Sequence, residues 1–349
     1  MRVLVAMSGG VDSSVAAALM KGDGHDVIGV TLKLWQGPNG EAPTAGCCTV
    51  GDAEDARRVA AQLDLPYYVF DYTSHFHSGV VDHFVGDYLS GRTPNPCVEC
   101  NRTVKFSRLL EQAGELGCDL LVTGHYARVT QQGGRFQLRR GMDRRKDQSY
   151  VLSMLTHKEL ARVKLPVGEL TKDETRAIAT ELGLRTASKP DSQDICFVGR
   201  DGYKAFLHRR SPDAHRRGHI VDLAGNVVGE HDGIAGFTIG QRRGVGVALG
   251  ERRYVVDVQP ATATVVIGHR RHLEVKTIDL DQVTWVDEPV EPGEIVEVQY
   301  RAHGQAVLAT WTGGSLIFDQ PQEAIAPGQT AAFYRQDQVL GSGVIAGAC

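Results

Sequence analysis

The sequence has no apolar run of about eighteen residues, which is the length that a helix needs to span a bilayer. The 349 residues are 42% hydrophobic and 23% charged, which is ordinary for a soluble globular protein. A single core usually stops growing below this length. The composition therefore argues against a membrane-spanning protein, and we expect no membrane partner. The length predicts two or three domains.

Cysteine is scarce, and the seven cysteines are an odd number. Disulfide frameworks use cysteines in pairs and are typical of secreted proteins. The N-terminal residues run directly into a strand pattern, which leaves no room for a secretory signal. We therefore expect a cytoplasmic protein whose cysteines are reactive or metal-binding thiols.

A strong excess of one charge is also missing, because the formal net charge is −4. This value argues against a protein that coats nucleic acid indiscriminately. Basic residues nevertheless cluster: residues 135–146 contain six basic side chains and one acidic one. Arginine pairs also occur at positions 209–210, 216–217, 242–243, 252–253 and 270–271. These clusters are candidate phosphate contacts or ordinary solvated surface, and the sequence leaves both interpretations open.

The stretch VLVAMSGGVDSSVAAALM contains an unusual turn. A strand pattern from Val3 to Met7 breaks at Ser-Gly-Gly, and apolar residues then resume at helical spacing. Gly9 and Gly10 allow a ligand to approach the main chain, and the unpaired N–H groups of the helix that follows attract phosphate. No lysine follows the glycines as it does in the common P-loop. The turn therefore predicts a phosphate-binding loop of another type.

The first half of the chain alternates strand and helix patterns. Strands are predicted at 3–7, 27–34, 67–71 and 119–123, with helices at 52–63, 76–88 and 104–116. This alternation is typical of an α/β, doubly wound parallel sheet that binds ligands at the carboxyl ends of its strands.

From about residue 205, helical periodicity gives way to β runs bounded by glycine. We predict an α/β domain over residues 1–205, a small β-rich domain over 206–275 and a barrel-like β domain over 276–349. The string GQRRGVGVALGERR fits either tight hairpins or a nucleic-acid-binding loop.

Three cysteines lie in polar loop sequences. Cys97 and Cys100 stand at CxxC spacing in RTPNPCVECNRTVKF, and Cys196 lies in KPDSQDICFVG. The prolines on either side of Asn95 are expected to exclude helix and to hold the pair just ahead of a helix, whose N-terminus favours thiolate. Structural zinc sites usually have four ligands. Three thiols therefore indicate a thiol relay or an incompletely ligated iron–sulfur cluster.

The string SGGVDSS resembles the pyrophosphate loop of the N-type ATP pyrophosphatases, the PP-loop superfamily. It is followed in order by NPC-x-x-CN, TGHYAR, KDQSYVL, DSQDICF and TIGQRRGVG. Together these strings resemble the tRNA-uridine 2-sulfurtransferase family over essentially the whole chain. The resemblance implies an ATP pyrophosphatase domain, a small central domain and a C-terminal β-barrel. It further implies that sulfur replaces O2 of the wobble uridine in tRNAs for Lys, Glu and Gln.

The resemblance also implies substrates, partners and site residues. ATP and Mg²⁺ would be used, and a cysteine desulfurase or sulfur carrier protein would supply sulfur. Cys100 would be the nucleophile, Cys196 would carry the persulfide, and Asp12 would act at the loop. ATP would be bound by Ala6, Met7, Ser8, Gly9, Gly10, Val11, Asp12, Ser13, Leu32 and Gly124. Contacts with tRNA would come from Asn95, Pro96, Cys97, His125, Lys146, Asp147, Gln148, Tyr300, Arg301 and Gln329.

One position departs from the common family pattern. Cys97 stands where many members have Asp, and members with Cys have been considered cluster-binding. We therefore expect that Cys97, Cys100 and Cys196 can hold a 4Fe-4S cluster, with a two-cysteine persulfide relay as the alternative. His125, seen without its TGHYAR context, also fits a hydrogen-bonded core histidine.

Two other functions fit the phosphate loop alone. One is an ATP-dependent amidotransferase or ligase that acts on a small metabolite, and the other is a nucleotide-binding module without chemistry. The three loop cysteines and the basic segment 135–146 argue against both. Pyrophosphate release that depends on added tRNA would separate them from the thiolation reaction.

Overall fold

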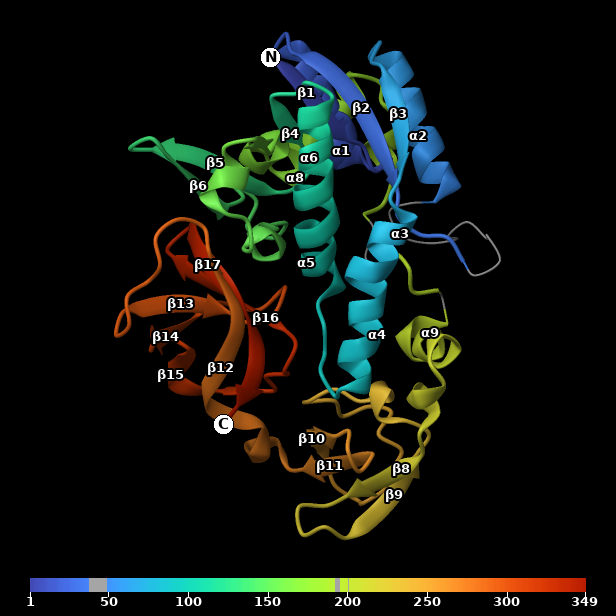
Figure 1. Cartoon of the computed structure of the whole chain (residues 1–349), viewed down its shortest axis with the longest axis vertical. Coiled ribbons are helices and arrows are strands. Elements are labelled where there is room, and N and C mark those ends of the chain that lie inside the picture. Colours follow the sequence, from blue (N-terminus) through green and yellow to red (C-terminus); the bar gives the residue numbers. More distant parts are fainter. Residues whose placement is uncertain (38–48, 192–194, 200) are drawn as a thin grey trace.

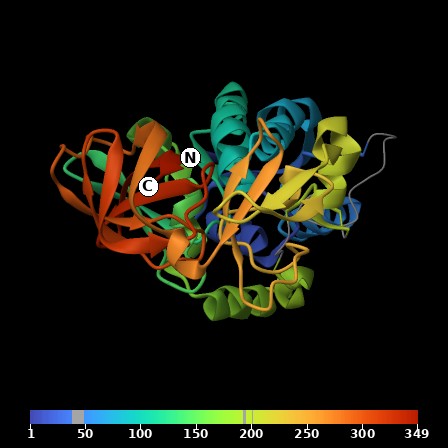
Figure 2. The ribbon, with the colours of Figure 1, turned by 90° about the horizontal axis from the view of Figure 1, so that it is seen from below.

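The structure is a computed structural model that describes residues 1–37, 49–191, 195–199 and 201–349. It contains three sheets. Figure 1 shows the sheet of the N-terminal half at the top, the sheet that ends at the C-terminus below it on one side, and the smallest sheet at the bottom. Seen from below, the two C-terminal sheets lie side by side (Figure 2). Within the described residues, no helix is both long and apolar enough to cross a membrane.

The first sheet confirms the predicted parallel architecture. Its strand order is β3-β2-β1-β4-β7, and every neighbouring pair is parallel. Its strands are β1 (Arg2–Ala6), β2 (Asp26–Lys33), β3 (Tyr67–Asp71), β4 (Leu120–Val122) and β7 (Val163–Lys164). The first four match the predicted strands to within two residues at each end, whereas β7 is only two residues long and left no sequence pattern.

Helices cover both faces of this sheet. Side chains of β1 alternate between the faces, so that Leu4 belongs to one apolar cluster, and Val3 and Val5 belong to another. The helices are α1 (Val11–Gly22), α2 (Val50–Gln62), α3 (Thr73–Phe76), η1 (His77–Val81), α4 (Asp82–Leu89), α5 (Pro96–Cys100), η2 (Asn101–Arg108), α6 (Leu109–Glu115), α7 (His157–Leu160), α8 (Lys172–Glu181) and α9 (Gly202–Arg210). Shorter turns are η3 (Ser149–Leu152), η4 (Pro166–Glu169), η5 (Arg185–Ser188), η6 (Pro212–His215), η7 (Ile234–Gly236) and η8 (Arg270–Leu273).

The strand order reverses between β1 and β4, where a parallel sheet of this type binds its ligands. The loop after β1 and the loop after β4 touch at this point. A Cβ atom added to Gly124 would lie 2.6 Å from the backbone nitrogen of Ser13. Position 124 therefore requires glycine so that the two loops can close around one site.

The central sheet has the order β10-β11-β8-β9. Its strands are β8 (Gly218–Val221), β9 (Val227–His231), β10 (Tyr254–Gln259) and β11 (Thr264–Gly268). Two sequence predictions were wrong in this region. Helical structure continues past residue 205, because α9 ends at Arg210. Residues 240–253, all of them described, contain no strand, so the hairpin interpretation of this glycine-rich string was wrong.

The C-terminal strands form a closed barrel, because β12 pairs with both β15 and β17. Its strands are β12 (Glu274–Trp285), β13 (Ile295–Gln299), β14 (Val307–Trp311), β15 (Ser315–Glu323), β16 (Thr330–Arg335) and β17 (Gln338–Ala348). A hairpin from the N-terminal half, β5 (Ala127–Gln132) and β6 (Arg135–Arg140), extends this sheet. Leu138 pairs with Val339. The barrel is therefore joined to the parallel-sheet domain by backbone hydrogen bonds.

Candidate active site

A cavity of about 520 Å³ opens at the carboxyl ends of β1, β2 and β4. Most of the predicted ATP-binding residues and four of the predicted tRNA-binding residues line it. They are Ala6, Met7, Ser8, Gly10, Val11, Asp12, Ser13, Leu32, Gly124, His125, Lys146, Asp147 and Gln148. Gly9 is absent from this lining among the described residues. Its φ is +71°, and a Cβ atom there would lie 2.1 Å from the carbonyl oxygen of Asp52, so Gly9 shapes the loop from behind.

The loop after β1 is held by its own side chains. The backbone N–H of Ser8 donates to Oγ of Ser13 at 3.1 Å. The hydroxyls of Ser13 and Ser14 donate to the carbonyl oxygen of Gly10 at 3.2 and 2.8 Å. Within the described residues, no side chain caps the N-terminus of α1. Its first N–H groups therefore suit a phosphate, as the sequence predicts.

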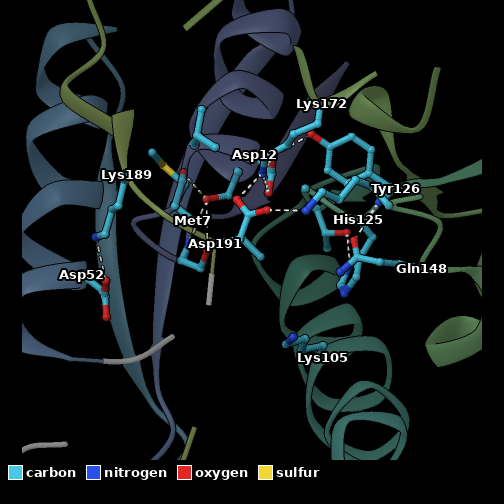
Figure 3. Close-up of a pocket in the computed structure, with 18 of the residues that line it drawn as sticks. Met7, Asp12, Asp52, Lys105, His125, Tyr126, Gln148, Lys172, Lys189 and Asp191 are labelled. Atoms are coloured by element: carbon cyan, nitrogen blue, oxygen red, sulfur yellow. Dashed lines mark hydrogen bonds and ion pairs between the residues drawn. The ribbon is translucent and has the colours of Figure 1, made fainter. Parts of the chain in front are cut away.

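A buried lysine brings two carboxylates together beside this loop. Lys172 begins α8, and its side chain is 7% exposed. Its Nζ donates to both carboxylate oxygens of Asp12, at 2.8 and 2.9 Å, and lies 2.7 Å from Oδ1 of Asp191. Figure 3 shows these three side chains together on the side of the cavity opposite Lys105. The site therefore contains a desolvated cation next to the place where phosphate is expected.

The two carboxylates have additional partners. The hydroxyl of Tyr126 donates to Asp12 at 2.7 Å. Burial raises the pKa of Tyr126, and the nearby Asp12 raises it further, so this hydroxyl stays a donor at neutral pH. Burial alone would raise the pKa of Asp191, but hydrogen bonds from Lys146 and Lys172 outweigh it and lower this pKa to about 2. Asp191 is therefore ionised throughout the physiological range.

A second lysine supports the loop from the other side. Nζ of Lys189 donates to the carbonyl oxygen of Gly9 at 2.9 Å and to the carboxylates of Asp52 and Asp55, both at 2.7 Å. Asp52 also accepts the backbone N–H of Thr49 at 3.0 Å and thereby completes the capping box at the start of α2. The start of α2 and the phosphate loop are therefore fixed to each other (Figure 3).

Sequence reasoning missed Lys172, Lys189, Asp191 and Tyr126 as residues of this cavity. Signals for some of them were present, because Lys189 and Asp191 lie in the same string as Cys196, and Tyr126 lies in TGHYAR. Lys172 follows a Thr that caps a helix, which predicts the helix but gives no indication that its first side chain reaches Asp12.

The first two candidate thiols lie inside a helix. The expectation that they stand just ahead of one was wrong. Pro96 is the first residue of α5, where its missing N–H costs nothing, and Asn95 accepts the backbone N–H of Val98 at 3.3 Å. Cys97 is exposed, whereas Cys100 is 7% exposed.

The third thiol, Cys196, is half-buried and packs against the apolar cluster that contains Cys100. Cys47 and Cys48 lie outside the described residues.

The three thiols do not fit the expected iron–sulfur cluster in this structure. Among residues 1–37, 49–191, 195–199 and 201–349, no three His, Cys, Asp or Glu side chains gather closely enough to hold a metal ion. A cluster held by Cys97, Cys100 and Cys196 would need all three sulfurs around one centre.

The structure separates the predicted tRNA-binding residues into three places. Four of them line the cavity. His125 lines the cavity and is half-buried, so it lies at the cavity wall rather than in the core. Its Nδ1 lies 2.7 Å from Oγ1 of Thr123. Tyr300 and Arg301 line a separate cavity of about 540 Å³ between the central sheet and the barrel. The remaining four, Asn95, Pro96, Cys97 and Gln329, lie at the start of α5 or against the segment before it.

Much of the basic segment 135–146 is neutralised by the protein's own carboxylates. Arg139 binds Asp337 at 2.7 Å, and Arg140 binds Asp147 at 2.9 Å. Other pairs join Arg135 to Asp287 and Glu288, and Lys146 to Asp191. Arg145 also lies near a carboxylate, 3.6 Å from Asp143, but its side chain is 82% exposed. Within this segment, the exposed Arg144 and Arg145 stay candidates for phosphate contacts.

Three family models match successive parts of the chain. They are the tRNA methyl transferase HUP domain over residues 1–200, the tRNA methyl transferase PRC-barrel domain over 204–269 and the aminomethyltransferase beta-barrel domain over 275–345. Full-length relatives carry a different name.

The chain is 47% identical over 350 residues to a tRNA-specific 2-thiouridylase of Herpetosiphon aurantiacus, with 99% of this chain and 98% of the relative covered. Proteins of the same name from Carboxydothermus hydrogenoformans and Clostridium perfringens are 45% and 43% identical, with 99% of this chain and 97% and 98% of the relatives covered. The loop, the thiol helix and these likenesses agree: the chain belongs to the tRNA-specific 2-thiouridylase family of PP-loop proteins.

Proposed function

We propose that this protein is a tRNA-uridine 2-sulfurtransferase that uses ATP to replace O2 of the wobble uridine with sulfur. Its tRNA substrates would be those for Lys, Glu and Gln, and its ATP domain would span residues 1–205. The observation that carries the proposal is the connection between the two halves of the site. Lys105, which lines the nucleotide cavity, follows Cys100 by five residues, about one turn of the π-helical stretch η2.

The first half-reaction would activate the base. A uridine carbonyl is a poor electrophile and oxide is a poor leaving group. O2 would attack the α-phosphate of ATP, the bond to the β-phosphate would break, and pyrophosphate would leave. The loop at Ser8–Ser13 and the ammonium of Lys172 lie where they can stabilise the charge on that leaving group.

Magnesium, which the family implies, fits the oxygen donors of this loop. The ion usually binds one or two carboxylates together with substrate phosphates and waters. The carboxylate of Asp12 and the hydroxyls of Ser8 and Ser13 offer that donor set at the cavity wall. When bound, the ion would neutralise phosphate charge.

The second half-reaction would deliver sulfur. The terminal sulfur of a persulfide on Cys196 would attack C2, and AMP would leave with the original oxygen. The thiolate of Cys100 would then attack Sγ of Cys196, which breaks the sulfur–sulfur bond to the base and forms a disulfide. A thiol reductant would reset the disulfide. Cys196 packs against the cluster that contains Cys100, which supports this pairing.

Recognition of tRNA would bring the wobble base out of its stack, as enzymes that act on bases generally require. His125 and Gln148 lie in the cavity wall, where an extruded base would meet the nucleotide. A cysteine desulfurase or a sulfur carrier protein would transfer sulfur to Cys196. The cytoplasmic location of the protein stays a prediction.

Product analysis tests the proposal. Purified protein with ATP, a persulfide donor and unmodified tRNA should produce AMP and pyrophosphate together with 2-thiouridine. Release of ADP and phosphate would contradict it. Pyrophosphate release that needs a small amide donor and no tRNA would favour the amidotransferase alternative, and nucleotide binding without turnover would favour the regulatory module.

A further inference from the structure

The segment that leads into the thiol helix is held by the barrel. The backbone N–H of Thr93 donates to the carbonyl oxygen of Pro327 at 2.7 Å. The side-chain amide of Gln329 donates to the carbonyl oxygens of Thr93 and Pro94, at 2.7 and 3.3 Å. Figure 1 shows this segment running up to α5 between α4 and the barrel. Residues more than 230 positions apart therefore meet directly ahead of Cys97 and Cys100.

The contact leaves little space for movement. A Cβ atom on Gly328 would lie 3.0 Å from the nitrogen of Thr93. The hydroxyl of the buried Tyr150 donates to the carbonyl oxygen of Thr330 at 2.8 Å and is also hydrogen-bonded to the side chain of Asn95, the residue that caps α5. The barrel loop at 327–330 and the cap of α5 are therefore parts of one contact.

We propose that Gln329 is a positioning residue, which fixes the entry into α5 and thereby keeps Cys100 in its buried position. Its importance for catalysis rests on the proposed function, but its effect on the thiol does not. Gln329 was expected to contact tRNA. The amide nitrogen of Gln329 donates to two protein carbonyls, whereas its amide oxygen can still accept a hydrogen bond, so the expected contact with tRNA stays a prediction.

The local chemistry explains why outside support is needed. Pro94 and Pro96 have no N–H groups, so the backbone here has fewer of the donors with which a strand or helix holds its neighbours. The carbonyl oxygens of Thr93 and Pro94 need partners from elsewhere. The amide of Gln329, on the barrel, donates to both carbonyl oxygens. These hydrogen bonds would fix the position of α5.

The experiment compares Gln329→Met, Gln329→Glu and Gln329→Lys with the native protein. Met and the ionised Glu cannot donate, whereas Lys keeps side-chain N–H donors. Gln320→Met, at an exposed position of β15, is the matched control. Each protein is treated with iodoacetamide without tRNA, and alkylation of Cys100 is followed by peptide mass spectrometry. The affinity for tRNA, the kcat of thiolation and the urea unfolding midpoint are measured in parallel.

We expect Met and Glu to raise the alkylation rate of Cys100 roughly tenfold, because lost hydrogen bonds make local opening easier. The kcat should fall while the Kd for tRNA stays within about twofold of native. Gln329→Lys should restore the native alkylation rate, and Gln320→Met should match the native protein.

Two results would overturn the proposal. The first is an unchanged alkylation rate of Cys100 in Gln329→Met and Gln329→Glu, whether or not tRNA binding changes. If tRNA binding weakens while that alkylation rate stays native, Gln329 is an RNA contact. An equal rise in the alkylation of Cys118, a buried cysteine far from the barrel in sequence, would mean general unfolding and would also overturn it. The alkylation rate of Cys100 does not depend on turnover. Failure of the proposed thiolation reaction can therefore be distinguished from failure of the proposed positioning role.

Discussion

Nζ of Lys172 lies 2.8 Å from Oδ1 of Asp12, although 160 positions separate the two residues in the chain. The phosphate loop lacks the lysine that follows the glycines in the common P-loop. The N-terminus of α8 supplies a lysine at this site instead. The same ammonium also contacts Asp191, so that it connects the loop to the string that carries Cys196.

Removal of this cation should slow adenylation. We expect Lys172→Met to lower the kcat of tRNA-dependent pyrophosphate release by roughly a hundredfold or more, as for a lost electrostatic contact to developing charge. Lys172→Arg should retain more activity because it keeps the charge. Lys21→Met, on the exposed end of α1, is the matched control. Native kcat in Lys172→Met, with the protein folded by circular dichroism, would remove Lys172 from the reaction.

Asp12 should be indispensable for the same step. Its carboxylate lies at the loop and is held by both Lys172 and Tyr126. Asp12→Ala should therefore abolish pyrophosphate release, and Asp12→Asn should not restore it, because the charge is lost. Tyr126→Phe keeps the ring and removes one hydrogen bond to Asp12, so we expect a loss of about 1 kcal/mol in unfolding free energy with partial activity. Pyrophosphate release measured with saturating ATP and tRNA checks the series.

The free energy of unfolding should depend on pH at acidic values through the ionisation of Asp191. Its folded-state pKa of about 2 lies below the ordinary value of 3.8, so its contribution is complete above pH 3.8 and is lost as the pH falls through about 2. The shift corresponds to about 2 kcal/mol. The difference in unfolding free energy between the native protein and Asp191→Asn should therefore shrink by about 2 kcal/mol between about pH 5 and about pH 2. Urea titrations at those pH values check it, and a constant difference would contradict it.

Binding of tRNA should depend on salt through the exposed part of the basic segment. Arg145 is largely exposed, and Arg144 is exposed beside it. Alanine at both positions should weaken binding for every tRNA substrate and lower the slope of log K against log salt by about 1.5. Arg135→Ala is the control, because Arg135 binds Asp287 and Glu288. Equal effects of the double variant and of the control would assign the whole segment to solvated surface.

Substitution of Cys97 should distinguish the two-cysteine persulfide relay from the iron–sulfur cluster mechanism. The described residues hold no metal-binding group of three, so we expect Cys97→Asp to keep activity with a persulfide donor, and Cys100→Ser and Cys196→Ser to lose it. Anaerobic reconstitution with iron and sulfide is the parallel measurement. Uptake of about four irons per chain, with thiolation from free sulfide that needs Cys97, would establish the cluster against this expectation.

Local patterns in the sequence determined much of this protein. The strand at Tyr67–Asp71 and the turn at Ser8–Ser14 follow from residue spacing and from glycine, because both depend on neighbours in the chain. The start of α5 was misjudged for a local reason too. Pro96 excludes a helix interior but favours the first helical position, and the sequence does not state which of the two applies.

The tertiary structure alone decided which distant groups meet. Lys172 reaches Asp12, Gln329 reaches Thr93, and four of the six basic residues in segment 135–146 are paired with carboxylates of the barrel and of neighbouring loops. Side chains such as Lys172 and Arg139 look like surface charges in the sequence, because burial and partners depend on how helices and sheets pack. The phosphate loop was determined by its own residues, whereas the place of Lys172 beside it and the contact of Gln329 with the segment before α5 were determined by packing between segments more than a hundred residues apart.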